Sequence, residues 1–350
     1  MTSHMITAPH RPQSGYPQSG YKIHSYGQAI AGLLLSVWLS GCNIGSQPAP
    51  NQSAANGAAK PSVVSTSTIL ADLTAQIAAD EVQLIGILEP GTDPHVYEPV
   101  PADSRDLEKA DLIFYNGYNL EPGLIKLMNA AGGRAQKVAV GEVVPPLQLQ
   151  KGQRETVPDP HVWGNVKNVM QMVTAIRDAL IELSPDDRDR FTQNAAQLTA
   201  QLEELDQWIT QQIQTIPPEK RRLVTTHDAF QYYARAYNLD IIGTLIGIST
   251  EEQPSAQTVQ RLVESVKSAQ VPAIFAETTI NPALIKTVAQ EAGVQLAPRS
   301  LYSDSIGAAE SDGDSYIKMM VVNTQTIVEA LGGKVTPFQP QRTPPSASQK

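Results

Sequence analysis

Residues 82–99 read VQLIGILEPGTDPHVYEP. The stretch begins with an apolar run at 82–88, which is followed by a proline and a glycine and then by a histidine. Such a run is typical of a buried strand, and the Pro90-Gly91 pair marks a turn. In parallel α/β sheets, ligands lie beyond the carboxyl ends of the strands. If the sheet is parallel, His95 lies at its ligand-binding edge.

Apolar runs and helical periodicity alternate on both sides of this stretch. We expect strands at 62–66, 82–88, 112–116 and 135–140, with helices at 67–79, 101–109 and 121–131 between them. Alternation of strand and helix favours a parallel sheet with helices packed on it. The first half of the chain is therefore predicted to be an α/β lobe, followed by a turn-rich connection at 141–157 and a helix at 165–183.

A long helix is predicted at 184–216. It begins with a serine, a proline and two acids, a strong helix start. Its length of about thirty residues corresponds to about 45 Å. A coiled coil is the alternative, but the run is short for that, and we prefer a helix that joins two lobes.

A second α/β unit follows the long helix. We expect strands at 222–226, 240–245, 273–277 and 294–297, and helices at 228–237, 255–269, 281–292 and 314–331. The predicted fold class is α/β, with two lobes, each a mainly parallel sheet flanked by helices, joined by one long helix. The predicted division is an N-terminal lobe at 61–183, the linking helix at 184–216 and a C-terminal lobe at 217–334.

The N-terminus has the pattern of a targeting segment. The apolar run 29–39 is shorter than the ~20 residues that span a bilayer and suits a signal peptide. Leu39-Ser40-Gly41-Cys42 resembles a bacterial lipobox, and Cys42 is the only cysteine of the chain. We interpret Cys42 as a lipid attachment site; an incidental cysteine is the alternative. The protein is then extracytoplasmic and lipid-anchored, on the periplasmic side or the cell surface.

The segments that flank the predicted lobes are of low complexity. After a signal peptide at 1–41, residues 42–60 are rich in Ser, Ala, Asn and Gln and suit a flexible tether. Residues 335–350 are rich in Pro, Gln and Ser, and we expect a disordered tail there.

The composition argues against nucleic-acid partners. The chain has 350 residues, a net charge of −9 and no cluster of Lys and Arg that could form a phosphate-binding face. The longest basic run, 220–222, directly precedes a predicted strand. A nucleotide site is also disfavoured, because no glycine-rich loop follows the first strand.

One short motif occurs twice. Asp93-Pro94-His95 and Asp159-Pro160-His161 are each followed by a valine and an aromatic residue. The proline restricts the backbone beside each histidine, and imidazole is the commonest protein metal ligand. Two such loops amount to half of a metal site. The alternative is that each histidine only occupies a turn or a helix cap.

Three histidines remain once the leader, with His4, His10 and His24, is set aside. His95, His161 and His227 each stand near the end of a strand or the start of a helix, and none lies on an apolar helical stripe. We therefore predict that all three bind one metal ion.

A carboxylate is expected as the fourth ligand. Asp304 is the first choice, although it could be a turn or helix cap, and Glu277 is the second; Glu277 could instead form hydrogen bonds within the second lobe. Asp93, Asp159 and Asp228 flank the histidines, where they either orient imidazoles or cap turns.

Taken together, these features resemble the metal-binding solute-binding lipoproteins of ABC importers, the zinc/manganese class known as cluster A-I. The resemblance covers 61–333. It rests on the two Asp-Pro-His motifs, with Tyr97-Glu98-Pro99 after the first and Val162-Trp163 after the second, and on Thr226-His227-Asp228-Ala229-Phe230 and Ser303-Asp304-Ser305. It implies that His95 and His161 from one lobe and His227 and Asp304 from the other coordinate a single divalent cation.

The resemblance leaves the metal open. Manganese binders of the class commonly have Glu where this chain has His227, and three imidazoles favour zinc over the harder manganese. Zinc members, however, often carry a histidine-rich loop, and residues 141–158 contain no histidine. Members with three His and one Asp also accept manganese. We expect zinc, with manganese as the alternative and iron behind it.

The resemblance also implies a role in transport. The protein would capture the cation outside the cytoplasmic membrane and deliver it to an ABC permease that works with a cytoplasmic ATPase. We expect no enzymatic activity. The rival hypothesis is a zinc hydrolase with Glu277 as its base, but the chain has no His-Glu-x-x-His motif. A stiff linking helix further implies small lobe movements.

Overall fold

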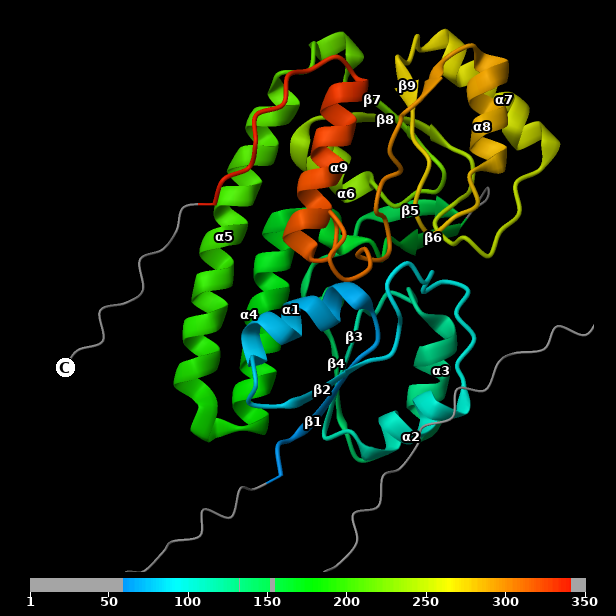
Figure 1. Cartoon of the computed structure of the whole chain (residues 1–350). Coiled ribbons are helices and arrows are strands. Elements are labelled where there is room, and N and C mark those ends of the chain that lie inside the picture. The colour runs from blue at the N-terminus through cyan, green and yellow to red at the C-terminus, as the bar shows by residue number, and fades with distance from the viewer. Residues whose placement is uncertain (1–58, 132, 152–154, 341–350) are drawn as a thin grey trace, which may run out of the picture. The chain divides into compact units, whose positions relative to one another are not determined.

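A computed structural model describes residues 59–131, 133–151 and 155–340 (Figure 1). The predicted signal peptide, Cys42 and nearly all of the predicted tether lie outside these residues. Within the described ranges, no helix is both long enough and apolar enough to cross a bilayer.

The N-terminal lobe contains a four-stranded parallel sheet with the order β2-β1-β3-β4. The central strand pairs with both neighbours, so that Val63 lies opposite Leu84 on one side and Leu112 on the other. The strands are β1 (Ser62–Ser65), β2 (Gln83–Gly86), β3 (Leu112–Tyr115) and β4 (Gln136–Ala139), and the helices are α1 (Thr68–Ala78), α2 (Pro101–Lys109), α3 (Pro122–Ala131) and α4 (Val166–Leu183).

Alternating side chains of the central strands bury both faces of this sheet. Val63 and Phe114 belong to the large apolar core that contains α1 and α4. Val64 and Ile113, one residue along each strand, pack in a separate core with residues of α2 and α3. Because successive strand side chains point to opposite faces, these apolar runs require helices on both sides, as predicted.

The C-terminal lobe is built from two pairs of parallel strands. β7 (Arg222–Thr225) pairs with β8 (Asp240–Thr244), and β9 (Ala273–Ile274) pairs with β10 (Gln295–Leu296). The amide of Phe275 donates a hydrogen bond of 2.9 Å to the carbonyl of Val224, which brings the two pairs together. The helices are α6 (Gln231–Tyr237), α7 (Ala256–Ser268), α8 (Ala283–Ala292) and α9 (Tyr316–Ala330).

The long helix α5 (Arg188–Gln214) runs alongside both lobes (Figure 1). It contacts α1 and α4 on the N-terminal side and α6 and α9 on the C-terminal side. One continuous apolar core includes the buried face of α5 and residues of both lobes. The predicted fold class is confirmed, and this shared core opposes large movements of one lobe against the other.

Short 3-10 turns connect several of these elements. They are η1 (Val140–Val143), η2 (Val162–Gly164), η3 (Pro185–Asp187) and η4 (Pro218–Lys220). Because η3 occupies the first turn of the predicted linking helix, the α-helical part is 27 residues long, or about 40 Å.

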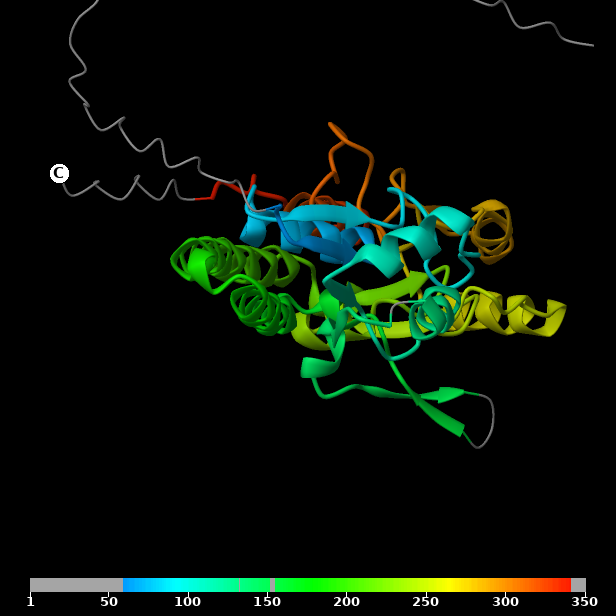
Figure 2. The same cartoon turned by 90° about the horizontal axis from the view of Figure 1, so that it is seen from below.

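The predicted turn-rich connection at 141–157 is wrong in one respect, because it contains an antiparallel hairpin. β5 (Gln148–Lys151) pairs with β6 (Glu155–Pro158), and Figure 2 shows the hairpin extending away from the sheets. Its strands are short and mostly polar, so they lack the apolar pattern from which strands are predicted.

The helix predicted at 228–237 begins only at Gln231. Asp228 donates its backbone N–H to the carbonyl of Gly247, and Ala229 donates to that of His227. The three residues after His227 therefore form a turn that a distant loop stabilises.

The expectation of a disordered tail from 335 onward is wrong for 335–340. Trp208 of α5 donates its indole N–H to the carbonyl of Thr336 at 3.0 Å, and the Thr336 amide donates to Oε1 of Gln212 at 2.8 Å. The ring of Phe338 lies 5.5 Å from that of Trp208. Residues 341–350 lie outside the described part of the chain.

Candidate metal centre

The repeated Asp-Pro-His motif forms the same local structure twice. Oδ1 of Asp93 accepts the backbone N–H of His95 at 2.9 Å, and Oδ1 of Asp159 accepts that of His161 at 3.0 Å. A carboxylate that binds the amide two residues onward closes an Asx turn. Each turn fixes the backbone from which one imidazole projects.

The imidazole of His161 is also held by a carboxylate. Nδ1 of His161 lies 2.7 Å from Oδ1 of Asp159. Because an ionised carboxylate only accepts hydrogen bonds, Nδ1 carries a proton, and Nε2 is the ring atom left to bind a metal. This is the arrangement that orients histidine ligands in metalloproteins.

His227 follows β7 by two residues and enters the site from the C-terminal lobe. Glu277, which follows β9, accepts the backbone N–H of His227 at Oε1 at 2.8 Å, and its Oε2 contacts Nδ1 of the same residue. Both oxygens of Glu277 are therefore used by His227. The second choice for the fourth ligand is instead the residue that orients His227.

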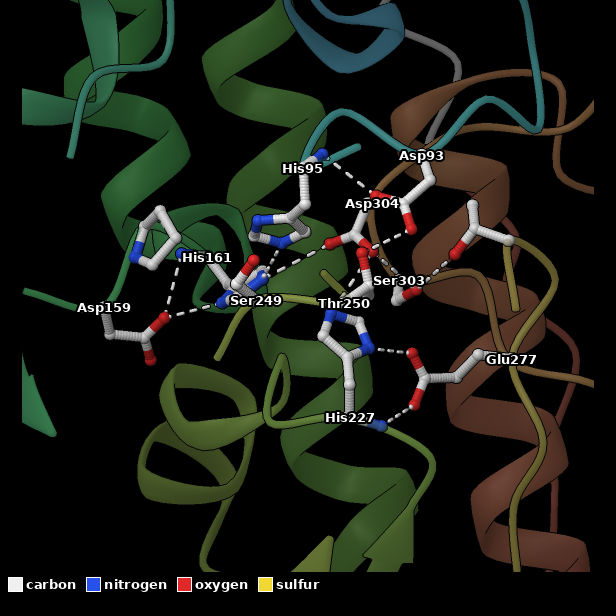
Figure 3. Close-up of polar contacts among 12 residues, drawn as sticks. Asp93, His95, Asp159, His161, His227, Ser249, Thr250, Glu277, Ser303 and Asp304 are labelled. Atoms are coloured by element: carbon white, nitrogen blue, oxygen red, sulfur yellow. Dashed lines mark hydrogen bonds and ion pairs between the residues drawn. The ribbon is translucent and has the colours of Figure 1, made fainter. Parts of the chain in front are cut away.

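The four predicted residues converge at one point (Figure 3). Nε2 of His95 lies 3.2 Å from Nε2 of His161. Asp304 places Oδ1 3.4 Å from Nε2 of His161 and Oδ2 3.2 Å from Nε2 of His227. One ligand atom from each residue lies within 4.8 Å of all the others.

This cluster is buried and its donor atoms are incompletely satisfied. His95 is 4% exposed, while His161, His227 and Asp304 are at most 1% exposed. Nε2 of His227 and Oδ1 of Asp304 form no hydrogen bond. Buried polar atoms normally have partners, and one cation placed among the four side chains would supply them here.

Burial and neighbouring charges shift the pKa values of the four proposed ligands. Burial alone would lower the pKa of His161, but Asp159 and Asp304 outweigh it and raise that pKa to about 9. For His227 as well, burial acts to lower the pKa, and the charges of Glu277 and Asp304 raise it well above its usual value. Burial lowers the pKa of His95 to about 3. The pKa of Asp304, which burial would raise, is held well below its usual range by His227 and His161.

The aspartates that flank the histidines have three different roles. Asp159 orients an imidazole, as described above. Oδ2 of Asp93 accepts the hydroxyl of Thr250 in the other lobe at 2.6 Å. Asp228 accepts the side-chain amide of Gln231 at the start of α6. Asp159 is therefore confirmed as an orienting residue that also closes a turn, and Asp93 as a turn residue. The bond of Asp228 is to a side chain and fits neither interpretation.

A buried network behind His161 was not predicted. Oε1 of Glu121 accepts the hydroxyl of Thr66 at 2.7 Å and the amide of Asn116 at 2.8 Å. The side chain of Asn116 in turn donates to the carbonyl of Pro160 at 2.9 Å. Burial raises the pKa of Glu121. The network fixes the loop that carries His161, and no local motif indicates it, because its members belong to different strands and loops.

Further hydrogen bonds connect the ligand loops of the two lobes. The indole of Trp163 donates to the carbonyl of Ser303 at 2.9 Å. The hydroxyl of Ser305 accepts the amide of Gly91 at 2.7 Å. Both partners from the C-terminal lobe adjoin Asp304, so the loop that carries Asp304 is bonded directly to the loops of His95 and His161.

Comparisons with known proteins agree with this geometry. The sequence model of the family described as "Zinc-uptake complex component A periplasmic" matches residues 63–330. The metal ABC transporter substrate-binding lipoprotein FimA of Streptococcus parasanguinis is 36% identical over 285 residues, which cover 80% of this chain and 92% of that protein. The manganese-binding lipoprotein MntA of Halalkalibacterium halodurans is 35% identical over 269 residues, which cover 77% and 88%.

A solved structure is similar over the same region. The periplasmic zinc binding protein TroA from Treponema pallidum superposes with a TM-score of 0.73 at 36% identity, over 78% of this chain and 99% of that chain. The two-lobed architecture therefore belongs to a known group of proteins. The names of these relatives include both manganese and zinc.

Proposed function

We propose that this chain, which belongs to the family of periplasmic zinc-uptake complex components, captures a divalent transition-metal ion for an ABC importer. The ion is bound outside the cytoplasmic membrane and passed to a membrane permease, which works with a cytoplasmic ATPase. The likeness to a metal ABC transporter substrate-binding lipoprotein over 92% of that protein's length supports this role.

The observation that carries the proposal is the convergence of His95, His161, His227 and Asp304 on one buried point. Three imidazole nitrogens and one carboxylate oxygen form a donor set that suits four-coordinate metal binding. Two ligands come from each lobe, so a bound ion also joins the lobes. Asp159 and Glu277 bind Nδ1 of two imidazoles, so Nε2 is the atom through which each would bind the ion.

Zinc is the metal that we favour, manganese is the alternative, and iron is the third candidate. Imidazole is a good ligand for zinc, whereas manganese prefers carboxylate and water oxygens, and this site offers a single carboxylate. Likeness to a zinc-binding protein of known structure supports zinc. Likeness to a manganese-binding lipoprotein supports the alternative.

We further propose that Cys42 carries a lipid that holds the protein at the outer side of the cytoplasmic membrane or on the cell surface. The lipobox-like sequence before Cys42 supports this, as do relatives that are named lipoproteins. The residues between Cys42 and β1 would then tether the two lobes to the membrane.

A binding role accounts for the site better than a hydrolytic one. A zinc hydrolase needs an open coordination position and a general base beside it. Glu277, the candidate base, uses both carboxylate oxygens on His227. Four protein ligands would also fill a tetrahedral site and leave no coordination position for a substrate.

The test is metal content and competition on the chain from residue 57 onward. Elemental analysis and titration with a chelator are expected to give one zinc per protein that resists excess manganese and is lost in His227→Ala. An exposed change on α5, Asp189→Asn, serves as the control. One manganese retained against zinc would reverse the metal assignment, and no stoichiometric metal would refute the function.

A further inference from the structure

The four proposed ligands are buried, so an ion needs a route to them. His95 is the most exposed of them, at 4%, against 0% for His161 and His227 and 1% for Asp304. His95 also lines a cleft with a volume of about 620 Å³, and none of the other three ligands does. This volume is many times the ≈ 30 Å³ that one water occupies in the liquid, so the cleft can hold a hydrated cation.

The cleft is bounded by both lobes. The N-terminal side includes Tyr118 and Pro122 near the start of α3, and the hairpin contributes Val157. The C-terminal side is the loop 247–252, which follows β8. The charged side chains among the described residues that line the cleft are three glutamates, Glu142, Glu251 and Glu252.

Two of these glutamates are available to attract a cation. Oε1 of Glu142 already accepts the backbone N–H of Tyr118 at 3.0 Å. Glu251 and Glu252 are exposed, and their carboxylates have no hydrogen bond or ion pair with any described residue. Their charges therefore act on the solvent of the cleft.

The loop that carries these two glutamates contacts the ligand loops directly. Thr250, between Ser249 and Glu251, donates its hydroxyl to Asp93, two residues before His95. The carbonyl of Gly247 accepts the amide of Asp228, the residue after His227. The loop thus lies beside ligands of both lobes, and the cleft that it borders leads to His95.

We propose that this cleft is the route by which the cation reaches its ligands, and that Glu251 and Glu252 accelerate its arrival. This inference rests on the function proposed above. Clefts that carry charge of one sign concentrate counter-ions and raise association rates. Behind His95, Nε2 of His227 and Oδ1 of Asp304 are buried without hydrogen bonds, and both could bind the ion.

The first experiment compares the rates at which Zn²⁺ and Mn²⁺ associate with the metal-free chain, measured by stopped flow at low and high salt. The test variant is E251Q/E252Q. The matched control, E264Q/E291Q, removes the same charge from exposed positions on α7 and α8 of the same lobe.

In the test variant we expect association about 3- to 10-fold slower at low salt, at or below the smallest effects of electrostatic steering because only two charges are removed. The factor is the same for both metals, because steering depends on charge, and it shrinks at high salt. Dissociation rates and the control variant stay at wild-type values. An unchanged association rate, an equal fall in the control, or a fall for one metal only would overturn the proposal.

A second variant tests the route independently of charge. Ser249→Trp places a bulky side chain in the cleft without altering a ligand. We expect association and dissociation to slow by the same factor, with an unchanged equilibrium constant and melting temperature. Unchanged rates would exclude this cleft as the route. If the wild-type protein binds no stoichiometric metal, the proposed function itself is refuted. That outcome differs from a failure of either variant experiment, in which the wild-type protein still binds metal.

Discussion

The two lobes contribute equally many proposed ligands but hold them in different ways. The N-terminal lobe presents His95 and His161 on Asx-turn loops, and only His161 has a carboxylate on its ring. The C-terminal lobe presents His227 just after a strand, with Glu277 bound to both its ring and its backbone, and adds Asp304. The N-terminal lobe thus provides the least constrained ligand, and the C-terminal lobe provides the anionic one.

This difference appears in the protonation of the metal-free site. The carboxylates around His161 and His227 raise the pKa of both imidazoles. His95 has no carboxylate on its ring, and burial lowers its pKa to about 3. His95 is therefore neutral at pH 7 and borders the cleft, where an incoming ion meets it first.

The strongest test of the contrast is Asp304→Asn, which removes the only negative charge among the proposed ligands and replaces one of the two oxygens that face His161 and His227. We expect zinc affinity to fall by more than about 100-fold, above the range for outer-sphere partners, as measured by chelator competition. His95→Ala should cost less, because His95 is the least constrained ligand. If His95→Ala lowers zinc affinity more than Asp304→Asn does, the N-terminal lobe provides the more important ligand, contrary to this expectation.

The orienting carboxylates should also differ. Asn at position 159 keeps one oxygen, and a single oxygen of Asp159 accepts both bonds from His161. Gln at position 277 places an NH₂ group where one of two required acceptors stood. We expect Glu277→Gln to lower affinity by about 100-fold and Asp159→Asn by about 10-fold. Equal losses of affinity in the two variants would show that the support of the imidazoles depends on the charge of the carboxylate rather than on the number of acceptor oxygens.

The pH dependence should reveal which histidines hold protons. At pH 7 the metal-free His161 and His227 are protonated, because their pKa values are raised, and His95 is not. Zinc must displace a proton from His161, so its affinity falls as pH drops below the pKa of about 9 of that residue, roughly tenfold per pH unit. A second proton must leave His227, whose pKa is raised well above its usual value, and this steepens the fall.

Calorimetry in buffers of different ionisation enthalpy measures these protons directly. About two protons should be released per zinc at pH 7, and fewer in Asp159→Asn, which lacks a charge that raises the pKa of His161. An onset of proton competition only near pH 6.5, the value for an unperturbed histidine, would contradict the raised pKa values.

The smallest expected effect concerns a hydrogen bond between the lobes. Thr250→Val removes the hydroxyl that binds Asp93 and leaves all ligands in place. Such a bond contributes about 1 kcal/mol, so zinc should dissociate about fivefold faster, as followed by transfer to a chelator in stopped flow. Thr258→Val, in the first turn of α7, is the control. Equal rates would mean that Asp93 and Thr250 do not hold the lobes together.

The sequence by itself determined the fold class and the identity of the converging residues. Apolar periodicity is a local signal, and here it indicated nearly every strand and helix, including α5. The four candidate ligands could be named because each stands in a short motif after a strand or before a helix. The hairpin β5–β6 was missed, since its polar strands carry no such signal, and so was the packing of 335–340 on Trp208 and Gln212.

Only the tertiary structure decided how each ligand is supported. The two Asp-Pro-His motifs are identical in sequence, yet Asp159 binds the ring of its histidine and Asp93 binds Thr250, 157 residues away. Glu277 lies 50 residues from His227, and no spacing rule relates the two. Hydrogen bonds between distant segments depend on how sheets and loops pack. The support of the imidazoles and the access to His95 were therefore decided by packing rather than by local sequence.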